Sequence, residues 1–137
     1  MRNILRLWEE GQQTAALDLL TRMYEARIAK AFFRVCSVSE ADFVTLPAQQ
    51  RDLLREKLLK DLKTMRHVAR AVATRAQELS RAGDLEAAEK LRGVLRRMGQ
   101  GNRAPAVPLL VDLVGKALEE RADALILDRR ATGSQAP

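Results

Sequence analysis

The sequence has few of the residues that metal and redox sites need. It contains one cysteine and one histidine in 137 residues. A single cysteine excludes a disulfide within the chain and any site built from several thiolates. A single histidine excludes the paired Glu-x-x-His motifs of carboxylate-bridged di-iron bundles. Cys36 follows an apolar run and is interpreted as a small buried hydrophobe, and His67, between Lys63 and Arg70, as a solvated side chain.

Aromatic residues and long apolar runs are also scarce. Aromatic residues make up 4% of the chain, and no segment alternates polar and apolar residues between hairpin turns, so β-strands are not expected. The longest apolar stretches, such as 107–113, are far shorter than the roughly 20 residues that span a bilayer. The first ten residues lack the apolar region of a signal peptide. We therefore expect no membrane span and a cytoplasmic location.

Catalytic motifs are missing as well. Gly99 and Gly101 lack the rest of a dinucleotide-binding fingerprint and do not follow a predicted strand. The serines and threonines are scattered, without the strand-turn-helix context of a nucleophile elbow. The sequence thus predicts no catalytic residue, no cofactor, no metal and no small-molecule substrate, and the protein is not expected to be an enzyme.

Helical periodicity, by contrast, runs along most of the chain. Its breaks predict a short apolar segment before Gly11, a helix over 12–35, a brief turn at Ser39 and Asp42, and helices over 47–82, 84–98 and 106–128. The fold class is therefore all-α, as an antiparallel helical bundle or a short stack of helical hairpins. We expect about five helices with one long central helix, in a single domain over 1–130 that is followed by a mobile tail over 131–137.

The predicted helix over 47–82 carries the clearest pattern in the sequence. Its apolar residues are spaced alternately four and three apart over three heptads, which predicts a continuous buried seam. Such a seam closes either inside one chain or between two chains, so the same residues are also a candidate interface. The seam consists of Leu58, Leu62, Met65, Ala69, Val72, Ala76 and Leu79.

Glycine-aspartate at 83–84 predicts a tight turn between two helices, and Gly11 has a similar place 72 residues earlier, where Ala16 aligns with Ala88. Segment 72–95 resembles the tetratricopeptide helical hairpin. Ala76 and Ala88 occupy its small packing positions, Leu79 its large one, and Gly83 its turn. The resemblance implies a helical-hairpin stack that binds protein partners.

Positive charge is the remaining feature with a functional meaning. The formal net charge is +6, and two successive predicted helices carry clustered cations. These could form one phosphate-binding surface, or they could be the solvated faces that amphipathic helices normally have. The candidate residues are Lys60, Lys63, Arg66, Arg70, Arg92, Arg96 and Arg97.

Broad apolar stripes without catalytic groups favour a non-enzymatic helical interaction or scaffold module, which holds a protein partner or self-associates. The main alternative is a nucleic-acid-binding helical protein that uses the basic helix face. Its affinity for nucleic acid would fall steeply as salt rises. A third alternative is a regulatory subunit of a larger assembly, which would have the same sequence features as the interaction or scaffold module.

Overall fold

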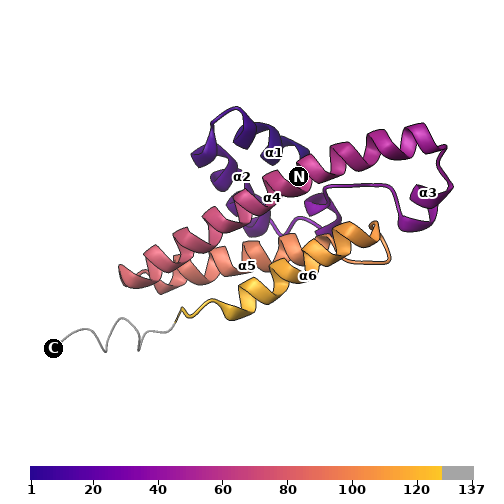
Figure 1. The fold of residues 1–137 in the computed structure, drawn as a ribbon. Coiled ribbons are helices and arrows are strands. Elements are labelled where there is room, and N and C mark those ends of the chain that lie inside the picture. The colour runs from indigo at the N-terminus through magenta and orange to yellow at the C-terminus, as the bar shows by residue number, and fades with distance from the viewer. Residues whose placement is uncertain (128–137) are drawn as a thin grey trace.

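The computed structural model describes residues 1–127, and every regular element in that range is a helix. Figure 1 shows α4, of 34 residues, running along most of the molecule. The all-α class with one long central helix is confirmed. There are six α-helices because the turn expected after Ser39 forms a separate short helix. The elements are α1 (Arg2–Glu9), α2 (Gln13–Glu25), the 3-10 turn η1 (Lys30–Phe33), α3 (Glu40–Thr45), α4 (Ala48–Arg81), α5 (Leu85–Gly101) and α6 (Leu109–Ala124).

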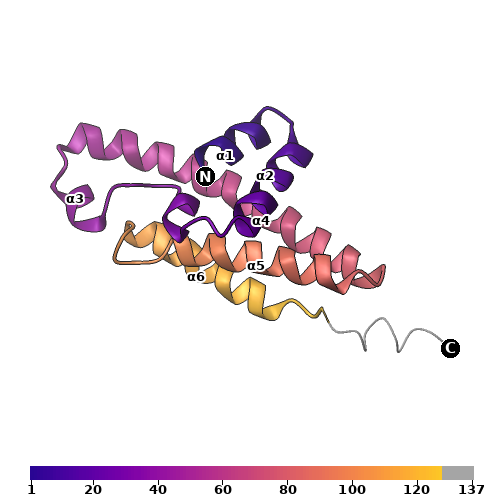
Figure 2. The same cartoon turned by 180° about the vertical axis from the view of Figure 1, so that it is seen from behind.

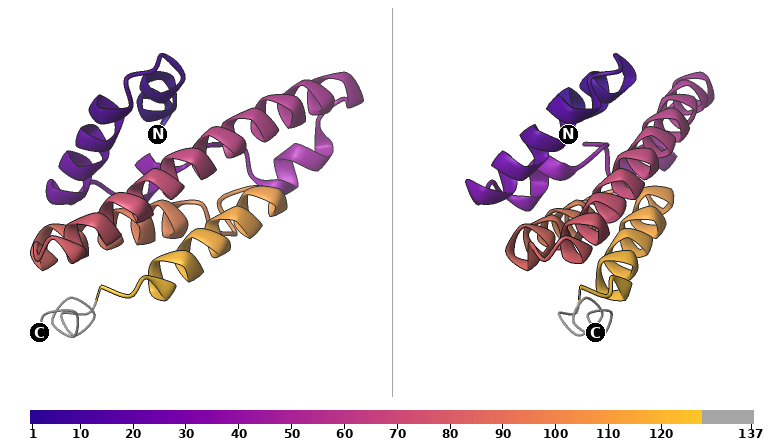
Figure 3. Two further views of the ribbon diagram at one scale, coloured as in Figure 1. Left: turned by 60° about the vertical axis from the view of Figure 1, so that its left-hand side comes forward. Right: turned by 90° about the vertical axis from the view of Figure 1, so that its left-hand side faces the viewer.

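Helices α4, α5 and α6 form the body of the molecule. Helix α5 runs antiparallel to both of its neighbours, so α4 and α6 run in the same direction (Figures 1 and 2). The α1–α2 hairpin packs on another side of this body, with α1 against α4 and α2 against α5 (Figure 3). Within residues 1–127, no helix is both long enough and apolar enough to cross a membrane.

The predicted seam of α4 is the centre of the core. Its first six residues, from Leu58 to Ala76, are at most 4% exposed, and Leu79 is partly buried. They pack against other helices of the same chain, α5 above all. The seam therefore closes inside one chain, and in this fold its residues are not available as an interface for another chain.

Two glycines end helices in the same way. Gly11 and Gly83 have φ angles of +80° and +87°, a conformation that glycine adopts without strain. The amide of Gln12 donates to the carbonyl of Leu7, and the amide of Asp84 donates to the carbonyl of Leu79, both at 2.9 Å. This is the usual glycine-terminated helix end, and it recurs although α1 has 8 residues and α4 has 34. The resemblance to tetratricopeptide hairpins stays a prediction.

The predicted helix over 12–35 is wrong beyond Glu25. Arg27, with φ of 55°, takes the left-handed position of the same hydrogen-bonded helix end. No glycine marks this turn, so residue types alone do not predict it. The chain then continues through η1, which places Phe33 in the core at 0% exposure. Burial of this phenyl ring offsets the strain at Arg27, because burying a large apolar side chain stabilises by roughly 1.5–3 kcal/mol.

Two other helices have bounds that differ from the predicted ones. Helix α5 continues to Gly101 instead of ending at 98, and α6 spans Leu109–Ala124 instead of 106–128. Pro108 precedes α6 as its N-cap, and the chain leaves the helix at Leu125, which is itself buried. The expected mobile tail over 131–137 lies outside the described residues.

The side chain of Asn102, just after α5, holds the start of the segment between η1 and α3 in place by hydrogen bonds. It is fully buried. Its amide nitrogen donates to the carbonyls of Phe33 and Met98, both at 2.7 Å, and its carbonyl oxygen accepts from the amide of Val35 at 2.9 Å. One side chain thus satisfies three backbone groups and holds residues 33–35 against α5.

The loop between α5 and α6 is held by carboxylates of α6. Arg103 donates to Asp112 at 2.8 Å and to Glu119 at 2.6 Å, and Asp112 also accepts from the amide of Ala104 at 2.7 Å. The bond from the Ala104 amide, with the bond from Arg103, holds the pKa of Asp112 below its ordinary value of 3.8.

A carboxyl whose pKa is lowered by folding stabilises the fold in its charged form. Its contribution is present above the pKa of the unfolded chain and is lost as the pH falls through about 4 and below. We expect the wild type to lose more unfolding free energy between pH 7 and pH 3 than Asp112→Asn does. Denaturant titrations at a series of pH values measure this difference, with Glu120→Gln as an exposed-carboxylate control. Parallel curves for the wild type and Asp112→Asn would contradict the assignment.

Candidate functional site

The four basic candidate residues of α4 are exposed. Among residues 1–127, none of their side chains has an ion pair or a hydrogen-bond partner. They are therefore cations whose charge is not neutralised within the described fold. The four are Lys60, Lys63, Arg66 and Arg70.

The three basic residues of α5 lie elsewhere and are more engaged. Arg92 binds Glu89 and the carbonyl of Leu125, and Arg96 donates to Asp123 at 3.0 Å. These contacts turn both arginines toward the C-terminal end of α6. Arg97 is half-buried and shares a helix face with Gly93 and Gly101, which lie against α2 and η1. The structure thus directs Arg92 and Arg96 toward the C-terminal end of α6, whereas the four candidate cations of α4 have no partner among residues 1–127.

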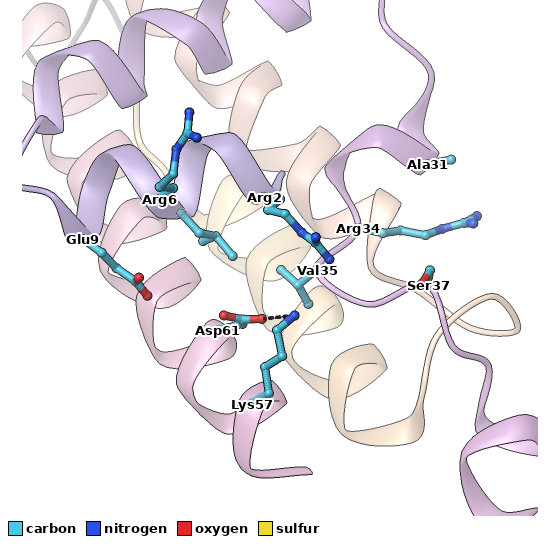
Figure 4. A pocket seen from close by; sticks show the side chains of 10 residues that line it. Arg2, Arg6, Glu9, Ala31, Arg34, Val35, Ser37, Lys57 and Asp61 are labelled. Carbon is cyan, nitrogen blue, oxygen red and sulfur yellow. Dashed lines mark ion pairs between the residues drawn. The ribbon is translucent and has the colours of Figure 1, made fainter. Parts of the chain in front are cut away.

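A cavity that sequence reasoning missed lies between α1, the segment after η1 and α4 (Figure 4). Its volume is about 550 Å³. Four cations line it, two from α1, one from the 30s segment and one from α4, together with two carboxylates. Leu5, Ala31 and Val35 provide apolar wall, and Ser37 provides a hydroxyl. The charged lining residues are Arg2, Arg6, Arg34, Lys57, Glu9 and Asp61.

The carboxylates of this cavity already have partners. Asp61 lies 3.6 Å from the ammonium of Lys57, and Glu9 accepts from the hydroxyl of Thr64 at 3.3 Å. The three arginines have no ion pair or hydrogen-bonded partner within residues 1–127. Burial and the charge of Arg2 lower the pKa of the Met1 amine, which donates to the carbonyl of Phe32 at 2.7 Å.

A second surface is apolar and lies at the α3 end of the molecule. Of the eight large apolar side chains exposed within residues 1–127, six lie on α3, the first half of α4 or the first half of α6. These three segments meet at one end of the molecule (Figure 1), where the Leu109 amide donates to Glu40 at 2.8 Å. The six are Val44, Leu53, Leu59, Leu109, Leu110 and Leu113.

Helix α6 contributes a continuous part of this surface. Leu109, Leu110 and Leu113 are 61, 39 and 58% exposed, and Ala117 is also exposed. These four residues, here named the α6 stripe, lie on the side of α6 away from its core residues, where Leu110, Leu113 and Ala117 are spaced three and four apart and Leu109 precedes Leu113 by four. Nothing in the described chain covers them, so α6 has a second apolar face besides the one in the core.

The side of α4 that faces away from α1 carries exposed residues next to the core. Thr64 and Asp61 of α4 point to α1, whereas Leu62 and Ala73 lie on the opposite side of the seam by helical register and are buried. Leu59, Arg66 and Arg70 lie next to Leu62 by helical register and are exposed. These three residues are named the α4 flank. Because α4 also contacts α6, we infer that this flank, with its exposed leucine and two unpaired arginines, lies on the side of the α6 stripe.

Comparison with protein-family models, with curated proteins and with solved structures gave no match. The residues themselves are therefore the basis of a functional assignment. Within residues 1–127 no three histidine, cysteine, aspartate or glutamate side chains are grouped as metal ligands would be. Cys36 is buried, as expected, with its thiol near the carbonyl of Val38, and His67 is exposed, as expected.

Proposed function

We propose that this protein is a non-enzymatic protein-interaction module whose docking surface is the α6 stripe together with the α4 flank. The observation that carries the proposal is the exposure of Leu109, Leu110 and Leu113 on one helix face. Single exposed apolar residues are common on soluble proteins, but contiguous exposed apolar surface is typical of sites that bind another protein. A regulatory subunit of a larger assembly would use the same surface.

The chemistry around the stripe specifies its partner as an amphipathic helix with acidic residues beside its apolar face. A helix that docks on another helix face presents apolar anchors three and four residues apart, which matches the spacing of the α6 stripe. Arg66 and Arg70 of α4 lie on one side of the stripe, and Lys116 and Arg121 are exposed cations of α6 itself. Carboxylates on the incoming helix would complement these charges and set its orientation.

A second copy of this chain is a poorer partner for the surface. Two copies would each bring a net charge of +6 to the complex. Symmetric pairing through the stripe would also place the α4 flank of each copy, with Arg66 and Arg70, close to the same interface. Like charges at an interface oppose association. A heterologous acidic helix avoids this repulsion.

A designed peptide tests the proposal directly. The probe is a helical peptide with leucines on one face and glutamates on both flanks, and its counterpart carries lysines in place of the glutamates. We expect the acidic peptide to bind the wild type and the basic peptide not to bind, as measured by fluorescence anisotropy. The variant Leu110→Glu/Leu113→Glu should weaken binding of the acidic peptide by at least about tenfold, since it places two charges in the apolar contact.

The matched control is Gln12→Glu/Gln13→Glu. It makes the same change in net charge at two exposed positions at the start of α2, on the α1–α2 hairpin and away from the stripe. This control should bind the acidic peptide nearly as well as the wild type. An equal loss in both double variants would mean that overall charge alone attracts the peptide, and equal binding of both peptides would contradict the acidic partner. A concentration-dependent dimer in solution that Leu110→Glu/Leu113→Glu abolishes would instead identify the occupant as a second copy.

A further inference from the structure

The cavity beneath α1 has the charge and the size of a site for a small organic phosphate. Its lining holds four cations and two carboxylates, a surplus of two positive charges. A phosphate monoester carries about −1.5 to −2 charges at pH 7, whereas a carboxylate carries only −1. A phosphate monoester therefore balances the two surplus positive charges of the lining, whereas a carboxylate leaves about one of them unbalanced.

The arrangement of the cations fits this chemistry. In Figure 4, the Arg2 side chain extends toward Val35 and the ammonium of Lys57, whereas the side chains of Arg34 and Arg6 point away from these two groups. Arginine binds phosphate through paired N–H groups, and lysine binds it as a compact charge. The side chains of Arg2, Arg6 and Arg34 have no ion pair or hydrogen-bond partner within residues 1–127. An incoming phosphate would therefore displace no ion pair of these three arginines, and it would share the ammonium of Lys57 with Asp61.

The cavity is larger than inorganic phosphate requires. Its volume of about 550 Å³ lies within the range of roughly 300–1,000 Å³ for small-molecule sites. Leu5, Val35 and Ala31 provide apolar wall beside the cations. We propose that the cavity between α1, residues 31–37 and α4 binds a phosphate monoester, with Arg2 and Lys57 at the phosphate, Arg6 and Arg34 as further cations of the lining, and the apolar wall against its organic group. This proposal is independent of the docking surface on α6.

Nuclear magnetic resonance titrations of the full chain test the proposal with three probes: phenyl phosphate, benzenesulfonate and inorganic phosphate. Phenyl phosphate and benzenesulfonate have similar shapes but differ by about one charge at pH 7. We expect phenyl phosphate to bind most tightly and to shift resonances confined to α1, residues 31–37 and the α4 residues around Lys57. Its affinity should fall as the pH drops through about 6, where the ester loses its second charge.

Two double variants separate a built site from general attraction to a basic protein. Arg2→Gln/Arg34→Gln should weaken phenyl phosphate binding by at least about tenfold, since it removes the charge-assisted contact of Arg2 and a second cation of the lining. Arg22→Gln/Arg81→Gln removes two exposed arginines from α2 and α4 and should leave the affinity unchanged. Equal weakening in both variants, equal affinity for all three probes, or shifts spread over the whole basic surface would overturn the proposal. A short single-stranded oligonucleotide that binds far more tightly than phenyl phosphate, with a steep salt dependence, would also overturn it in favour of a nucleic-acid surface.

Discussion

Replacing Asn102 by leucine is expected to lower the free energy of unfolding by about 3 kcal/mol, because it leaves buried backbone groups without partners. The amide side chain of Asn102 satisfies the carbonyls of Phe33 and Met98 and the amide of Val35. Leucine has a similar size, so the loss reports on hydrogen bonds more than on an empty space. Urea denaturation followed by circular dichroism measures the change.

The sequence offers one matched control, since Asn3 is the other asparagine of the chain and is exposed. Asn3→Leu should change the unfolding free energy by no more than about 0.5 kcal/mol, as is usual for surface substitutions. Equal and small effects of the two substitutions would contradict the role given to Asn102.

The second large effect is expected at Gly115, where α6 crosses α5. A Cβ atom there would lie 2.8 Å from the carbonyl oxygen of Gly99 and closer still to the backbone of Asn102. Backbone atoms in packed helices cannot move aside cheaply, and overpacking of this kind costs typically 1–3 kcal/mol and occasionally more. Gly115→Ala should therefore destabilise the fold by about 2–3 kcal/mol, although alanine favours a helix by about 1 kcal/mol over glycine. Thermal and urea denaturation measure the loss.

Gly93 in α5 is the comparison for Gly115. A Cβ atom at Gly93 would meet only the outer end of the Tyr24 ring, whose Cε2 lies 2.7 Å away. A partly exposed tyrosine side chain can rotate to make room, so Gly93→Ala should be close to neutral. A loss at Gly93 as large as that at Gly115 would show that both glycines are limited by the same tight packing, contrary to this account.

The sequence predicted the parts of the fold that local chemistry determines. The seam from Leu58 to Ala76 repeats every seven residues, and Gly83 followed by Asp84 marks a helix end and the next cap, where Asp84 accepts from the Ala87 amide at 3.2 Å. Periodicity and turn chemistry are local signals. The end of α2 was missed because Arg27, not a glycine, takes the left-handed position there.

The functional surfaces were harder to predict because they depend on tertiary contacts. Arg92 and Arg96 were expected to extend the basic face of α4, but their partners lie near the C-terminal end of α6, which no periodicity identifies. The cavity brings Arg2 together with Lys57, 55 residues later in the chain. The α6 stripe has the pattern of an ordinary apolar helix, and the sequence alone does not say which apolar face remains uncovered.

The most direct test of the α6 docking surface is photo-crosslinking from position 113 in the cell. A photoreactive amino acid replaces Leu113 in one variant of the protein and Gln13, an exposed residue of α2 away from the stripe, in a second variant. Mass spectrometry then identifies the segment that is joined to each position. We expect position 113, but not position 13, to join to an amphipathic helix rich in aspartate and glutamate beside its apolar face. Crosslinks from position 113 only to a second copy of this chain, or to the same segments as position 13, would contradict the proposed docking surface.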